Sequence, residues 1–96
     1  MRLYRAIILS LVLFVSTLCN AQLNTTRVME IGRNALYFED YVLSIQYFNK
    51  VIDSKPFLHE PYFYRGLAKF YLDDFVGACE DFSSAIERNP YIAQCY

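Results

Sequence analysis

The sequence has a single histidine, no cluster of basic residues and no apolar run long enough to cross a bilayer. A zinc site needs three or four ligands, and no partner lies at ligand spacing from His59, so we expect a solvated loop residue and no metal site. The scattered basic residues leave no electrostatic footprint for nucleic acid. These absences exclude nucleic acid as a partner and metal as a cofactor.

The N-terminal segment has the features of a signal peptide. Two arginines precede the apolar run Ala6–Leu18, and small residues stand before the bond between Ala21 and Gln22. This run is shorter than the roughly 20 residues that a transmembrane helix needs. We therefore interpret 1–21 as a cleaved secretory signal and expect a periplasmic or secreted protein. The alternative is an uncleaved segment that anchors the protein, which would make the membrane a partner.

The part that follows the signal is small and acidic. It holds seven basic residues against ten acidic ones, which gives a net charge of −3. Residues 22–96 form at most one small domain. Cys79 and Cys95 are too far apart along the expected helices for a disulfide, and we expect both to be small buried residues.

The chain contains an internal repeat, in which 27–60 aligns with 61–94 without a gap. The alignment gives seven identical pairs, against roughly two expected by chance. The pairs are Gly32/Gly66, Tyr37/Tyr71, Asp40/Asp74, Val42/Val76, Phe48/Phe82, Ile52/Ile86 and Pro56/Pro90. We therefore divide the chain into a linker at 22–26, two repeats at 27–60 and 61–94, and the start of a third at 95–96.

The pattern within each repeat predicts two helices. Apolar residues recur at steps of three and four, as on one face of a helix. Each repeat has an aspartate in the middle that can cap its second helix and a proline that stops that helix. The sequence predicts an all-α fold of helix-turn-helix repeats, with helices at about 25–38, 41–54, 60–72 and 75–88.

These repeats resemble the tetratricopeptide repeat, a helix-turn-helix unit of the same length. The second copy carries the family signature at Tyr62, Gly66, Ala68, Phe75, Ala78, Phe82, Ala85 and Pro90. The first copy matches at Gly32, Tyr41, Phe48 and Pro56 but has Val28 and Ser44 in place of the aromatic residue and the alanine. The resemblance implies an α-solenoid segment in which Gly66 faces Ala78, while Phe82 and Ala85 fill the space toward the next unit.

The resemblance also implies a concave groove lined by the first helix of each unit. Such a groove would hold an extended or helical segment of a protein partner. By their match to the family positions, the lining residues are Met29, Arg33, Leu36, Tyr37, Phe63, Leu67, Phe70 and Tyr71. About half of them are expected to pack against neighbouring helices instead. A groove that clamps the terminal carboxylate of a partner is not expected, because Arg33 is the only basic residue among those that line it.

Nothing in the pattern suggests catalysis. The acidic pairs at 73–74 and 80–81 are interpreted as a helix cap and a solvated helix face, since acid–base chemistry needs a pocket. We expect a non-enzymatic adaptor or scaffold of the cell envelope, without a cofactor or a small-molecule substrate. About three units are usually needed for a stable solenoid, so we also expect 1–96 to be the front of a longer protein. The alternative function is then the N-terminal arm of an envelope enzyme or sensor.

Overall fold

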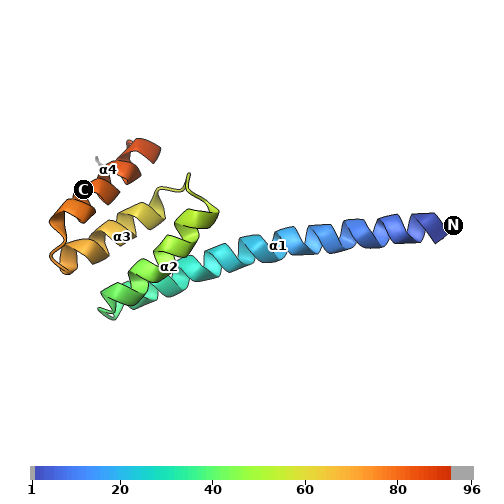
Figure 1. Ribbon diagram of the computed structural model, residues 1–96, viewed down its shortest axis with the longest axis horizontal. Helices are drawn as coiled ribbons and strands as arrows, with labels where there is room; N and C mark the ends of the chain where they lie inside the picture. The colour runs from blue at the N-terminus through green and yellow to red at the C-terminus, as the bar shows by residue number, and fades with distance from the viewer. Residues whose placement is uncertain (1, 92–96) are drawn as a thin grey trace.

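Four helices make up the part of the chain that the structure describes (Figure 1). The computed structural model describes the backbone of residues 2–91 and the side chains of residues 2–13 and 24–91. The helices are α1 (Arg2–Tyr37), α2 (Tyr41–Ser54), α3 (Glu60–Tyr71) and α4 (Phe75–Arg88). No strand occurs within these residues, so the all-α prediction is confirmed.

The helices pack as two consecutive hairpins. α2 packs between α1 and α3, and α4 packs on α3. Figure 1 shows the α1–α2 and α3–α4 turns at the same end of the molecule, with the connection 55–59 at the opposite end. α1 and α3 consequently run in the same direction, as the helical-repeat pattern predicts.

α1 is much longer than the sequence predicts. It begins at Arg2 rather than near residue 25, and it includes 22–26, which we expected to be a linker. Neither proline nor glycine interrupts the chain before Gly32, so the helix continues. Residues 2–13 are all exposed and extend away from the hairpins, which gives the molecule overall dimensions of 63 × 28 × 19 Å (Figure 1).

No helix among the described residues combines the length and the apolar character that a bilayer-spanning segment requires.

The two repeats match each other in atomic detail at the turns. Glu39 and Asp73 both adopt left-handed backbone angles, with φ of 66° and 65°. The following aspartates then cap α2 and α4: the Asp40 Oδ1 accepts from the Leu43 N–H at 3.3 Å, and the Asp74 Oδ1 accepts from the Gly77 N–H at 3.0 Å. The predicted caps are therefore confirmed, and they fix where each second helix begins.

Small residues let the helices within each hairpin approach closely. A Cβ added to Gly66 would lie 2.7 Å from the Phe82 Cε1 and 3.3 Å from the Ala78 carbonyl oxygen. A Cβ added to Gly32 would lie 2.8 Å from the equivalent atom of Phe48. The predicted contact of Gly66 with Ala78 is confirmed. Phe82 packs on Gly66 within its own hairpin. The expectation that Phe82 also fills the space toward a next unit concerns residues outside those described.

Candidate functional site

The groove predicted from the sequence corresponds to the surface where α1 and α3 lie alongside each other. The eight predicted residues divide along it into three groups. Met29 and Arg33 line a pocket near the N-terminal end of α3. Leu36, Phe63 and Leu67 are half-buried, and Tyr37, Phe70 and Tyr71 are exposed at the end formed by the turns.

The half-buried group is only partly available to a partner. The Phe63 ring lies 5.8 Å from the Phe82 ring and 5.6 Å from the Tyr64 ring, measured between centroids. Phe63 therefore contributes to the packing of α3 on α4 as well as to the surface. The sequence alone could not tell which of the predicted residues would serve such packing.

The pocket has a volume of about 300 Å³ and is bordered by residues of three elements. α1 contributes Met29 and Arg33, the α2–α3 connection contributes Lys55 and Leu58, and α3 contributes Tyr64. Neither Arg33 nor Lys55 forms an ion pair with any described residue. Sequence reasoning missed Lys55 and Leu58, because nothing in the connection between two repeats shows that it folds back over the first helix.

The opposite end of the groove merges into a larger apolar surface on the two turns. We call this surface the turn edge and define it as residues 37–43 and 70–76. Among the described residues after 23, twelve large apolar or aromatic residues are exposed, and nine of them belong to the turn edge. They are Tyr37, Phe38, Val42, Leu43, Phe70, Tyr71, Leu72, Phe75 and Val76.

Aromatic contacts join the two halves of the turn edge. The Tyr41 and Tyr71 rings stack with their centroids 5.1 Å apart and their planes 14° from parallel. Phe70 meets Phe75 edge to face at 5.4 Å. Desolvation raises the pKa of the Tyr41 hydroxyl, with smaller contributions from the Glu39 carboxylate and Tyr71. The first and second repeats thus present a continuous surface at this end.

A buried ion cluster lies behind the groove, between α3 and α4. Asp81 is only 3% exposed. Its carboxylate accepts two hydrogen bonds from the Arg65 guanidinium, at 2.8 and 2.7 Å, and lies 3.0 Å from the Lys69 ammonium. Arg65 also donates to the Asn49 side chain of α2 at 2.8 Å, and the hydrogen bond to Asp81 raises the pKa of Arg65.

This cluster corrects one sequence-based interpretation. Asp81 was expected on a solvated helix face, but it is a buried anion that ties α4 to α3. The physical reason is that Arg65 and Lys69, four residues apart, project from the same face of α3. Such a pair of cations stabilises a carboxylate on the facing helix. The sequence of α4 alone does not reveal this contact.

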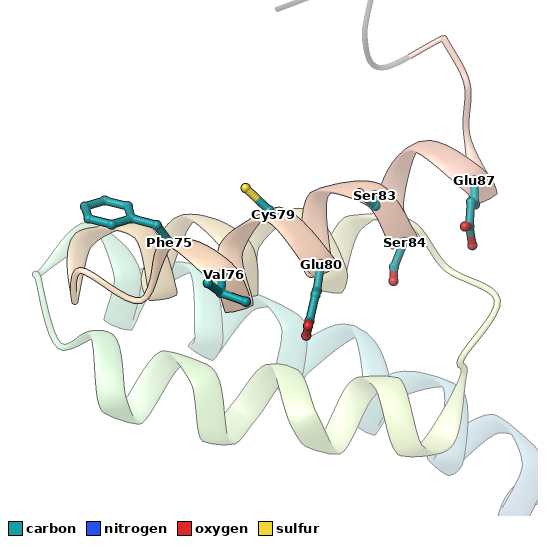
Figure 2. A pocket seen from close by; sticks show the side chains of 7 residues that line it. All are labelled: Phe75, Val76, Cys79, Glu80, Ser83, Ser84 and Glu87. Atoms are coloured by element: carbon teal, nitrogen blue, oxygen red, sulfur yellow. The ribbon is translucent and has the colours of Figure 1, made fainter.

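Figure 2 shows the outer face of α4, where seven side chains border a shallow depression. They are Phe75, Val76, Cys79, Glu80, Ser83, Ser84 and Glu87. Cys79 was expected to be buried, but its thiol is exposed. Ile45, the corresponding residue of α2, is half-buried because α3 covers α2, whereas no described element covers α4. Cys95 lies outside the described residues.

In the described part of the chain, the remaining candidate residues form no catalytic or metal-binding arrangement. His59 is half-exposed before α3, and its Nε2 lies 3.4 Å from the Glu60 carboxylate. No group of three or more His, Cys, Asp or Glu residues among those described is placed to hold a metal ion.

No known protein family matches the chain, and neither does any curated protein.

Proposed function

We propose that this protein is an exported, tetratricopeptide-like adaptor or scaffold that binds a segment of a protein partner. The segment lies in the groove between α1 and α3. The observation that carries this proposal is the pocket between those two helices, with Met29 and Arg33 on one wall and Tyr64 on the other. Small concave sites with apolar walls and a few polar groups are typical ligand sites.

The dimensions of the groove favour an extended peptide. α3 has 12 residues, which corresponds to a length of about 18 Å at 1.5 Å per residue. An extended chain rises about 3.3 Å per residue, so the groove accommodates about five residues of a partner. Leu36 and Leu67 supply apolar contacts, and the side chains at the turn edge supply aromatic contacts at the end.

Export is the second part of the proposal. Residues 2–13 are apolar for the most part and exposed, and they extend away from the two hairpins (Figure 1). The position of this segment outside the folded core supports a targeting role. Cleavage after Ala21 would leave the last part of α1, from residue 22, as the first helix of the groove. Intact mass measurement of the protein recovered from its cellular compartment tests this directly, because an uncleaved anchor retains residues 1–21.

Site-specific photocrosslinking in the source cells tests partner binding. A benzophenone amino acid replaces Met29 or Leu67 in the groove, and replaces Phe57 as the control. Phe57 is an exposed aromatic residue of the connection 55–59 that does not line the pocket. We expect a discrete adduct with another polypeptide at the two groove positions and none at Phe57. Equal adducts at all three positions, or adducts at Phe57 alone, would rule out the groove as the binding surface.

A further inference from the structure

The turn edge combines exposed apolar side chains with negative charge, and binding in the groove does not require this combination. Its apolar side chains are exposed to an unusual degree, with Tyr37 at 82%, Phe38 at 76% and Val76 at 73%. Soluble proteins rarely leave a contiguous apolar patch of this kind uncovered unless it is a contact surface. The stacked rings of Tyr41 and Tyr71 make the patch continuous across both repeats.

Charge of one sign accompanies the aromatic residues. Each turn carries two carboxylates, from Glu39 and Asp40 and from Asp73 and Asp74, and the turn edge contains no basic residue. No cation among the described residues forms an ion pair with these four groups. Asp40 and Asp74 each accept one backbone N–H, but Glu39 and Asp73 are exposed at the tips of the turns.

The charge decides between the possible occupants. A bilayer presents anionic phosphates, which the four carboxylates repel. A second copy of the chain that docked through the same surface would place four carboxylates against four. A cationic segment suits both features, because lysine and arginine pair with carboxylates and their charged groups also bind over the faces of tyrosine and phenylalanine rings.

We propose that the turn edge is a second docking surface, which binds a polypeptide segment that has lysine or arginine residues interleaved with apolar ones. The apolar residues of the segment pack between the two turns, and its cations meet Glu39 and Asp73. The internal repeat gives the surface two equivalent acidic tips, one on each turn. A segment with two cationic positions therefore engages both tips at once and binds more tightly than a segment with one.

The turn edge shares Tyr37, Phe70 and Tyr71 with the end of the groove, so the test uses other residues. Phe38, Glu39, Leu72 and Asp73 belong to the turn edge and do not line the pocket between α1 and α3. Substitutions at these positions leave Met29, Leu67 and the pocket unchanged. Failure of one proposal can therefore be distinguished from failure of the other.

The test measures binding of a designed peptide to the full-length chain in non-ionic detergent, by fluorescence anisotropy. The probe is an end-blocked, labelled octapeptide, Lys-Leu-Ala-Lys-Leu-Ala-Lys-Leu, and the control peptide has glutamate in place of every lysine. One chain variant combines Glu39→Gln with Asp73→Asn. The matched variant combines Glu80→Gln with Glu87→Gln and makes the same change in net charge on the outer face of α4. A third variant, Phe38→Ser with Leu72→Ser, removes apolar surface from the turn edge.

We expect the lysine peptide to bind and the glutamate peptide not to bind. The Glu39/Asp73 variant should weaken binding about tenfold, and the matched variant less than twofold. The Phe38/Leu72 variant should also weaken binding about tenfold, although it retains every charge. Equal loss in the two charge variants would mean non-specific attraction and would overturn the proposal, as would the absence of any loss. Circular dichroism of each variant identifies any chain that has failed to fold.

Two further measurements test whether a membrane or a second copy of the chain binds the turn edge instead. The Phe38/Leu72 variant should co-sediment with vesicles of phosphatidylcholine and anionic phosphatidylglycerol to the same extent as the original chain. The variant should also have the same sedimentation coefficient as the original chain. Reduced vesicle binding would assign the turn edge to the membrane, and a smaller assembly would assign it to self-association. Either result would overturn the cationic-segment proposal without bearing on the groove.

Discussion

Removal of the Asp81 carboxylate should destabilise the fold severely. The change Asp81→Ala leaves the Arg65 and Lys69 side chains, only 18% and 23% exposed, without a counter-charge. Loss of one partner from a buried ion pair costs about 3–5 kcal/mol. Because both cations retain some contact with water, we expect the lower end, about 3 kcal/mol. The folded repeats have a total stability of about 3–10 kcal/mol at ordinary values per residue, so the loss is a large share of it.

Urea denaturation followed by circular dichroism measures this loss. The control is Glu80→Ala, which removes the neighbouring exposed carboxylate and should change the free energy of unfolding by less than about 0.5 kcal/mol. The triple change Arg65→Met, Lys69→Met and Asp81→Leu should restore stability to near the original value, since apolar replacement of a whole buried cluster is often neutral. If Asp81→Ala and Glu80→Ala had equal effects, the ion cluster would not hold α4 on α3, and the reasoning would be refuted.

Three smaller predictions concern the turns and α4. Asp74→Ala removes the cap that holds the Gly77 N–H, and should lower the free energy of unfolding by about 1 kcal/mol in the same urea assay; an unchanged midpoint would contradict the capping role. Asp73→Gly should raise stability by up to about 1 kcal/mol, because glycine adopts φ of 65° without steric cost; a loss of stability would contradict this. The exposed Cys79 thiol should react with a maleimide in the native chain as fast as in urea, as measured by peptide mass mapping; strong protection before denaturation would show that α4 is covered.

The hairpins could be predicted from the sequence because their signals are local. The aspartates at the helix starts and the spacing of the repeat place α2, α3 and α4 within one residue of their observed ends. The contact of Gly66 with Ala78 was predicted through the resemblance to the tetratricopeptide repeat, in which small residues let the two helices of a unit approach closely. The start of α1 was missed, because sequence patterns mark where packing begins and not how far an uninterrupted helix continues.

The candidate site could be predicted less well, because it depends on contacts between distant residues. Lys55 reaches the pocket only because the connection folds over α1. Asp81 looks like one acidic residue among several until the cations of α3 are placed opposite it. Cys79 was expected to be a small buried residue, but no described helix covers the outer face of α4, whereas α3 covers α2.

The most direct test of the groove is a nuclear magnetic resonance titration of the methyl-labelled, full-length chain with the partner segment recovered by crosslinking. We expect the methyl signals of Met29, Leu36 and Leu67 to shift together and to saturate at one ligand concentration. The signal from Ile86 on α4, which lies outside both the groove and the turn edge, should remain unchanged. A shift confined to Ile86 would place the partner on α4 and contradict the claim that α1 and α3 form the binding groove.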